Sequence, residues 1–238
     1  MLFELLDDTR IVSVTALSRD ANLSYFHVRA AHLTVNHGAV EEIVPLSPDL
    51  VVTSDNTTAL ATHLLTRLGM TVLSLPSANR LADYRANLRR LAHVLGVEAR
   101  AEQLLSQLDG ALRAAPPQPR LRTLVYQPNG FTPGPDSLMD EILDHAGLDS
   151  LAAELGLSNG GYLSLESLLL SKPEMIVFSA RQTARPSLAE TQLDQPALRH
   201  LFARHGAPTR RAAVPENLWA CAGAFNREAI ALLRQARQ

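Results

Sequence analysis

The stretch Glu42-Ile-Val-Pro-Leu-Ser-Pro-Asp-Leu-Val-Val-Thr-Ser54 returns in the second half of the chain as Glu166-Ser-Leu-Leu-Leu-Ser-Lys-Pro-Glu-Met-Ile-Val-Phe-Ser179, with one residue inserted. In each copy an apolar helix ends at a Ser-Pro-type stop, because proline disfavours helical geometry in the residue before it. The continuous apolar run that follows is typical of a parallel strand covered on both faces. A helix-to-strand unit used twice predicts two similar α/β lobes, and two lobes can form a cleft.

Length and composition indicate a globular chain of one large or two small domains. It has 238 residues, of which 46% are hydrophobic, and a formal net charge of −2, which gives no support for binding nucleic acid or an anionic membrane. Cys221 is the only cysteine, so no internal disulfide can form, and we expect a structural role for it. Residues 1–8 lack the features of a signal peptide, which favours the cytoplasm unless the chain is a mature or truncated form.

The remaining sequence alternates strands and helices. We expect a long helix over residues 98–115, which the proline-rich run at 116–119 stops. We expect a helix after the polar loop 53–58, capped by Asp55, Asn56 or Thr57, with four leucines on one face (Leu60, Leu64, Leu65 and Leu68). The expected strands cover residues 11–14, 50–52, 71–75, 121–125, 175–178 and 212–214.

This alternation predicts an α/β fold with two Rossmann-like lobes, each built on a parallel sheet, joined by one long helix. The expected division is an N-terminal lobe at residues 1–96, a connecting helix and proline-rich stop at 97–118, and a C-terminal lobe at 119–238.

Ligands of parallel α/β sheets bind beyond the carboxyl ends of the strands, so the loops that follow the strands are the candidate site. These loops carry aromatic and neutral polar side chains, which suit a bulky, partly apolar ligand. Several of these residues have a simpler structural explanation: Trp219 can pack under the last helix, Tyr162 can lead into a helix, and Arg181 can lie on a solvated loop. The candidate ligand-binding residues are Ser18, Asp55, Asn56, Tyr126, Asn129, Tyr162, Arg181 and Trp219.

Motifs of catalysis and metal binding are missing from the sequence. The eight histidines do not form a zinc-binding pattern, and no Gly-x-Ser-x-Gly elbow, P-loop or Gly-x-Gly-x-x-Gly occurs. We therefore expect no catalytic residue, no protein-built metal site and no cofactor. An α/β enzyme using the same cleft, with Asp55 or Glu216 as acid or base, is the alternative.

The order of helix, Ser-Pro-Asp-Leu-Val-Val strand, polar loop and Leu-Gly-Met-x-Val strand resembles the class III solute-binding proteins of ABC importers, and so does the stretch Gly160-Gly-Tyr-Leu-Ser-Leu-Glu-Ser-Leu168. These receptors deliver cobalamin, ferric siderophores, haem or chelated metals. The resemblance implies a periplasmic, monomeric receptor with two lobes joined by one rigid helix, a bulky metal chelate in the cleft, and a membrane permease as partner. Any metal is expected inside the ligand.

The chain departs from this family in three places. No arginine cluster marks the cleft as a site for an anionic ferric chelate, which favours a neutral or corrinoid-like ligand. The first strand that members carry before the segment resembling residues 2–8 is absent here. Members dock on the permease through an acidic residue on each lobe; residues 57–62 contain none, while Glu190 can serve on the other lobe. The leading hypothesis is a receptor that closes by only a few degrees on its ligand; the enzyme above and a degenerate receptor that binds a partner protein remain the alternatives.

Overall fold

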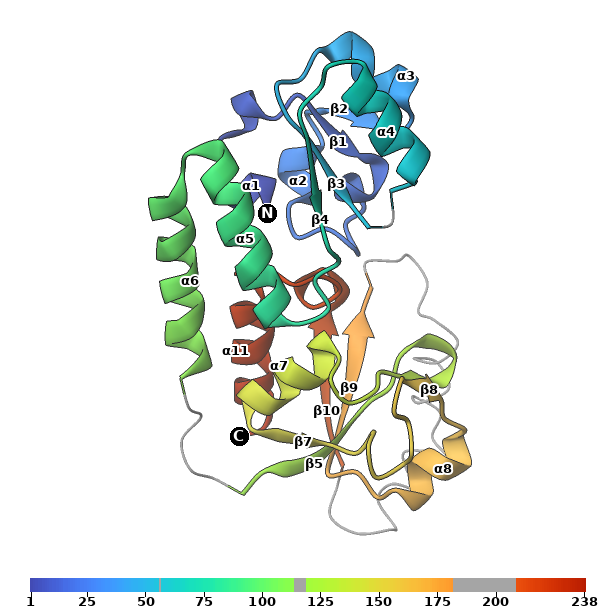
Figure 1. Ribbon diagram of the computed structural model, residues 1–238. Coiled ribbons are helices and arrows are strands. Elements are labelled where there is room, and N and C mark those ends of the chain that lie inside the picture. The colour runs from blue at the N-terminus through green and yellow to red at the C-terminus, as the bar shows by residue number, and fades with distance from the viewer. Residues whose placement is uncertain (56, 114–118, 182–208) are drawn as a thin grey trace. The chain divides into compact units, whose positions relative to one another are not determined.

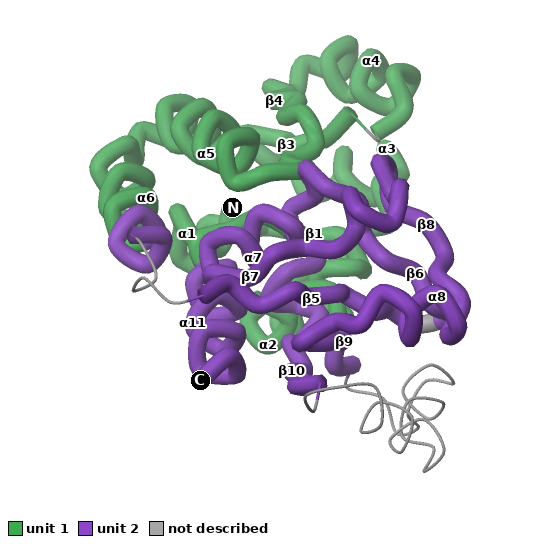
Figure 2. The backbone as a smooth tube through the Cα atoms, turned by 90° about the horizontal axis from the view of Figure 1, so that it is seen from below, with its two compact units in different colours: residues 1–107, 221–224 green, residues 108–220, 225–238 purple. Residues whose placement is uncertain are grey.

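A computed structural model of the chain describes residues 1–55, 57–113, 119–181 and 209–238. Two compact units make up the chain, coloured separately in Figure 2. Unit 1 comprises Met1–Gln107 and the short segment Cys221–Ala224, and unit 2 comprises Leu108–Ala220 and Phe225–Gln238. The division falls inside the helix α6 (Glu98–Leu112).

Unit 1 is built from short parallel strand pairs and helices. The strands β1 (Ser13–Thr15) and β2 (Thr34–Asn36) form one parallel pair, and β3 (Val51–Ser54) and β4 (Val72–Leu75) form another. Its helices are α1 (Leu2–Leu5), α2 (His27–Ala30), α3 (Val40–Ile43), α4 (Ala59–Arg67) and α5 (Leu81–Leu95). The first part of α6 also belongs to this unit.

Unit 2 contains a four-stranded, entirely parallel sheet. Its strands lie in the order β10 (Arg210–Pro215), β9 (Met175–Ala180), β5 (Leu121–Val125) and β7 (Leu148–Ser150). The helices α7 (Leu138–Ala146) and α11 (Asn226–Ala236) pack together beside this sheet (Figure 1). The pair β6 (Phe131–Thr132) and β8 (Gly161–Tyr162) is antiparallel and forms a separate small ribbon, which α8 (Leu165–Leu170) follows in the chain.

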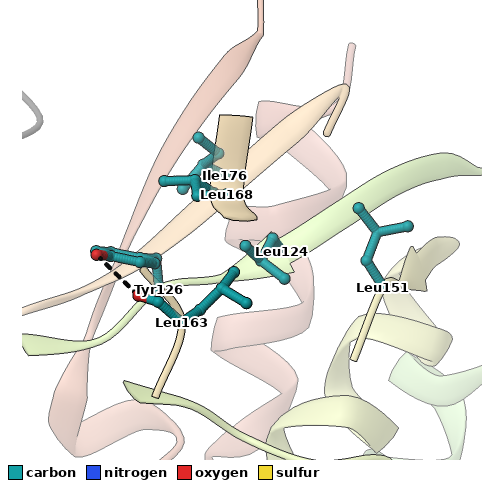
Figure 3. Close-up of a cluster of buried hydrophobic side chains, with 6 residues drawn as sticks. All are labelled: Leu124, Tyr126, Leu151, Leu163, Leu168 and Ile176. Carbon is teal, nitrogen blue, oxygen red and sulfur yellow. Dashed lines mark hydrogen bonds between the residues drawn. The ribbon is translucent and has the colours of Figure 1, made fainter. Parts of the chain in front are cut away.

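One side of the unit 2 sheet carries a dense apolar cluster, drawn in Figure 3. Leu124 of β5 and Ile176 of β9 are register partners in the sheet, and both are buried with Leu168 of α8. The side chains of Tyr126, Leu151 and Leu163 complete the buried cluster. The continuous apolar run of β9 is thus explained by burial on both faces, as expected for a parallel strand.

The repeated sequence phrase folds alike in both copies. In the first, the chain leaves the short helical segment after α3 through Ser47 (φ 46°), and in the second it leaves α8 through Lys172 (φ 47°). Both residues adopt the left-handed conformation that closes many helices, and a proline follows each of them. A strand then begins within four residues, so the predicted helix-to-strand unit is confirmed in both copies.

Each of the six predicted strands is confirmed at its approximate position, and 121–125 matches β5 residue by residue. The first expected strand is displaced, because residues 8–10 form a 3-10 turn and β1 begins only at Ser13. The sequence reading missed β2, β6, β7 and β8. Each of these strands has only two or three residues, too few for an apolar run or an alternation to be recognised.

The predicted cap of α4 is wrong. Thr58 caps the helix, because its Oγ1 accepts a hydrogen bond from the backbone N–H of Ala61 at 3.3 Å. Neither Asp55 nor Thr57 holds this position, and Asn56 lies outside the described residues. The helix begins one residue later than the latest of these caps, Thr57, would allow.

The prediction that four leucines of α4 share one face is also wrong. Leu65 is 1% exposed, whereas Leu60, Leu64 and Leu68 are 67%, 38% and 58% exposed. At about 100° per residue, Leu65 projects roughly 140° away from Leu60 around the helix axis. The helix therefore buries Leu65 and leaves the other three leucines largely in solvent.

Glycines close two of the later helices. The helix α5 ends at Gly96 and α7 ends at Gly147, both in the left-handed conformation, and Ser137 caps α7 through a hydrogen bond from Asp140 N. The helix α6 ends at Leu112, earlier than the predicted end at residue 115. Glu190, the predicted docking residue of the other lobe, lies outside the described residues.

Candidate functional site

The strand order of unit 2 reverses at β5. The chain passes from β5 to β7 on one side and then to β9 on the other, so the loops after β5 and β9 leave the sheet in opposite directions. In open α/β sheets the crevice outside the carboxyl ends of such strands is the usual ligand site. The residues that follow β5 and β9 are therefore the candidate site of this unit.

Tyr126 comes directly after β5 and is part of the core. It is 4% exposed, its backbone N–H donates to the carbonyl oxygen of Val177 at 2.9 Å, and its hydroxyl donates to the carbonyl oxygen of Leu163 at 3.5 Å (Figure 3). Burial raises the pKa of the phenol, so the hydroxyl stays protonated at neutral pH. The side chain supports the floor of the candidate site.

The turn after Tyr126 is tight and presents Asn129 to solvent. Gln127 N donates to the carbonyl oxygen of Phe131 at 2.8 Å, and the short 3-10 segment Pro128–Gly130 lies between them. Asn129 has a φ of 62°, in the left-handed region that asparagine tolerates better than most residues. The predicted residue is thus placed, exposed, at the carboxyl end of β5.

Arg181 follows β9 and forms an ion pair. Its Nε lies 3.0 Å from a carboxylate oxygen of Glu216, and the side chains are 39% and 17% exposed. The carboxylate of Glu216 therefore offsets the positive charge of Arg181. The same pair holds Glu216, the proposed acid or base of the enzyme alternative, against a cation.

Trp219 is buried, as the structural explanation of this residue supposed. It is 1% exposed, and its indole Nε1 donates to Ser179 Oγ at 3.0 Å. Because Ser179 lies near the carboxyl end of β9, the indole fixes a residue of the strand that leads to Arg181. Trp219 therefore supports the candidate site from within the unit.

Tyr162 is 76% exposed and lies on β8, opposite Phe131 of β6. The two ring centroids are 5.6 Å apart and the ring planes meet at 68°. The sequence reading singled out Tyr162 but missed Phe131. No local signal could have found Phe131, because β6 and β8 are too short to show the alternation of a strand and lie 31 residues apart in the chain.

The candidate residues of unit 1 follow strands of two different pairs. Ser18 lies in the 3-10 turn after β1, and its hydroxyl is 3.4 Å from Thr15 Oγ1. Asp55 follows β3 and accepts hydrogen bonds from the backbone N–H and the hydroxyl of Ser77, in the loop after β4. The Asp55 carboxylate thus ties together two loops at the same end of the β3–β4 pair. Asn56 lies outside the described residues.

Cys221 was expected to be structural, but it is exposed. Desolvation raises the pKa of its thiol, so the sulfur is protonated near neutral pH. This supports the expectation that it is not a reactive thiolate.

Across the described parts of the chain, no cluster of three or more histidine, cysteine, aspartate or glutamate side chains is arranged to hold a metal ion. Among the same residues, no helix has the length and apolar character needed to cross a membrane.

The structure is similar to solved periplasmic and ABC-transporter binding proteins. The heme-binding protein RhuT from Roseiflexus sp. RS-1, in apo form, superimposes with a TM-score of 0.74 at 18% identity over 100% of this chain and 94% of that one. The heme-binding protein HutB of Vibrio cholerae gives 0.74 at 19% identity over 94% and 89%. An ABC transporter substrate-binding protein from Listeria monocytogenes gives 0.69 at 15% identity over 99% and 93%. At these identities the likeness shows a shared fold.

The sequence itself decides the family. No curated protein matches it. The family model described as periplasmic binding protein matches residues 1–204, which is most of the 238-residue chain. The chain therefore belongs to the periplasmic binding protein family.

Proposed function

We propose that this protein is the substrate-binding component of an ABC importer, and that it holds a bulky metal chelate such as haem, cobalamin or a ferric siderophore. Membership of the periplasmic binding protein family supports the receptor role. Solved proteins of the same fold include two periplasmic heme-binding proteins and an ABC transporter substrate-binding protein. The proposal places the protein in the periplasm, as a monomer that delivers its ligand to a membrane permease.

The observation that carries the proposal is the construction of the carboxyl end of the unit 2 sheet. Three of the predicted residues (Tyr126, Asn129 and Arg181) follow β5 and β9, the strands at which the sheet changes direction. Tyr126 and Trp219 are buried in the unit, which holds the backbone at this end of the sheet in place. A rigid backbone lowers the ordering cost of binding a ligand.

The charges at this surface favour a ligand without a strong net negative charge. Arg181 is offset by Glu216 at 3.0 Å, so it offers an anion less than a free guanidinium would. Asn129 and the remaining N–H groups of Arg181 supply directed hydrogen bonds. We propose that any metal arrives inside its chelator, with no metal or cofactor held by the protein itself.

We propose direct ligand contacts for Asn129, Tyr162 and Arg181 in unit 2, and for Ser18, Asp55 and Asn56 in unit 1. We propose an indirect role for the two buried residues. Tyr126 holds Leu163 through a hydrogen bond to its carbonyl oxygen, and Trp219 holds Ser179 on β9 through its indole N–H. None of these roles requires proton transfer, and the matched family is one of binding proteins.

A thermal-shift screen against hemin, cyanocobalamin and a ferric hydroxamate siderophore tests the proposal. A ligand that binds only the folded state adds about 2.7 kcal/mol at a free concentration 100 times its Kd. We expect one of the three to raise Tm in a concentration-dependent way. Unchanged Tm with all three, confirmed by calorimetric titration, would contradict the proposed ligand class.

Asn129→Gly provides a matched variant for the ligand that binds. Glycine accepts a φ of 62° without steric cost, so the variant removes the amide and preserves the turn. Loss of one hydrogen bond should weaken binding by up to about tenfold. An unchanged affinity, with an unchanged Tm of the free protein, would exclude Asn129 from the ligand contacts.

A further inference from the structure

Two aromatic rings are exposed side by side on the β6–β8 ribbon. Phe131 and Tyr162 are direct cross-strand partners, 37% and 76% exposed, while their neighbour Thr132 on β6 is 1% exposed. The ribbon therefore turns its buried side inward and both rings outward. Cross-strand aromatic partners stabilise each other, but the free face of such a pair gains nothing from solvent.

The backbone that carries the two rings is held in one conformation. Leu163 N donates to the carbonyl oxygen of Gly130 at 2.8 Å, and Gln127 N donates to that of Phe131 at the same distance. These bonds fasten both strands of the ribbon to the turn after β5. The aromatic pair is thus tied to the carboxyl end of the central sheet.

Glycines make this close approach possible. A Cβ on Gly130 would lie 2.6 Å from Leu163 O, and one on Gly134 would collide with the backbone nitrogen of Gly160. A Cβ on Gly160, which has a φ of +79°, would lie 3.1 Å from the Phe131 ring. Any side chain at Gly130 or Gly134 would push the two segments apart. The sequence thus accepts three restrictive glycines in a segment whose outer face carries two exposed aromatic rings.

The geometry of the rings is suited to a flat ligand. At 68° to each other, Phe131 supports Tyr162 edge-on, so the tyrosine ring need not give up side-chain freedom when a ligand stacks on it. A conjugated ring system offers a large π face to such a platform, whereas a hydroxamate or carboxylate siderophore offers mainly polar edges. We expect the two carboxylates of a protoporphyrin to stay in solvent, because the nearest described cation after β9, Arg181, is already paired with Glu216.

We propose that Phe131 and Tyr162, called here the aromatic step, stack against the conjugated ring of the ligand, so that the protein recognises a planar tetrapyrrole-like ring whether or not it contains a metal. The inference rests on the proposed receptor function and narrows its ligand class. Tyr162 contacts the ring directly, and Phe131 is a positioning residue that holds Tyr162 in place.

The test is titration of the full chain with iron protoporphyrin and with metal-free protoporphyrin, followed by absorbance and fluorescence. We expect both to bind with affinities within about fivefold of each other, because stacking uses the ring face and not the metal. Tyr162→Leu should weaken both by about tenfold or more, and Tyr162→Phe should change neither by more than about twofold, because the ring is kept. Phe131→Leu should weaken both by a smaller factor, about threefold.

Leu170→Ala is the control for non-specific adsorption of porphyrin. Leu170 is 74% exposed on α8, in the same unit but outside the ribbon, and its removal should leave both affinities unchanged. Because Tyr162 is largely in solvent, Tyr162→Leu should keep the Tm of the free protein, so the test stands even if Phe131→Leu fails to fold.

Three outcomes would overturn the inference. Equal porphyrin affinities for the wild type and Tyr162→Leu would show that the aromatic step does not contact the ligand. Loss of iron protoporphyrin binding alone in Tyr162→Phe would show that the phenol oxygen acts on the metal. Binding of cyanocobalamin or a ferric siderophore, with no binding of either porphyrin, would leave the receptor function standing and the planar-ring inference wrong. If none of these ligands binds, the proposed function fails with it.

Discussion

The two copies of the repeated phrase end in strands with very different surroundings. The first copy ends in β3, which pairs only with β4 among the residues that the structure describes, and only the first of its four residues is buried. The second copy ends in β9, which lies between β5 and β10, and its first three residues are all 0% exposed. The same sequence pattern therefore specifies the helix, the turn and the strand, whereas neighbouring strands decide how deeply the strand is buried.

The largest expected difference between the copies is in core stability. Ile176→Ala on β9 should cost about 2–5 kcal/mol, because it deletes a fully buried side chain and leaves a cavity. Val52→Ala on β3 should cost less than about 1.5 kcal/mol, because Val52 is partly exposed and loses fewer methyl groups. Urea unfolding followed by amide hydrogen exchange in each unit measures both values. Equal losses at the two sites would contradict the difference in burial.

Ser54 and Ser179, which end the two copies, are also expected to differ in their contribution to stability. Ser179→Ala removes the acceptor of the Trp219 indole N–H and leaves a buried donor unpaired, which should cost about 1–3 kcal/mol. Ser54→Ala should cost about 0.5 kcal/mol or less, because Ser54 is partly exposed and water can replace lost contacts. The tryptophan fluorescence of unit 2 should shift only in the Ser179 variant. A shift of similar size in both variants would argue against this role of the hydrogen bond.

The residues before the two prolines are where the copies should behave alike. Ser47 and Lys172 both have φ values near +47°, which glycine adopts without the steric cost that other residues meet. Ser47→Gly and Lys172→Gly should each stabilise the protein by about 0.5 kcal/mol, the small net result after the added entropy of the unfolded chain. Thermal unfolding of each variant measures this change. If one variant is stabilised and the other destabilised, the two turns do not share the same conformational cost.

We expect the smallest effect on stability at Glu42 and Glu166, the acidic residues at which the two copies begin. The side-chain hydrogen bond with His37 is the largest cause that holds the pKa of Glu42 below its ordinary value of 4.5, helped by a hydrogen bond from the His37 backbone. Because the folded-state pKa is lowered, the stabilisation is complete above pH 4.5 and is lost as the pH falls through the lowered value.

We therefore expect the stability difference between the wild type and Glu42→Gln to shrink as the pH falls below 4.5, measured by thermal unfolding over a pH series. Glu166→Gln, at the matching position of the second copy, is the control. A difference for Glu42→Gln that stays constant down to low pH would rule out this linkage.

The outline of the fold could be predicted because each of its signals is local. The proline stops and the apolar run of β9 act within a few residues, and the structure has both where the sequence indicates. The cap of α4 and the leucines of the same helix were predicted wrongly, because burial depends on what packs against a helix. Leu60 and Leu65 are chemically identical, yet the first is exposed and the second is buried.

The candidate site was predictable to a lesser degree. That Tyr126, Asn129 and Arg181 follow β5 and β9 could be predicted from strand positions. The sequence could not predict that β5 and β9 are neighbours at the point where the strand order reverses, because no local signal reports strand order. Phe131 was missed for the same reason: its partner Tyr162 is 31 residues away, and only the cross-strand pairing brings the two rings together.

The sequence by itself thus determined the α/β class, the repeated helix-to-strand unit and the family, because periodicity, proline and glycine act on neighbouring residues. Only the tertiary structure decided that β9 is central and β3 is not, that Trp219 supports the site from inside, and that Arg181 is paired with Glu216. These features depend on contacts between residues far apart in the chain, and such contacts form only when the whole unit packs.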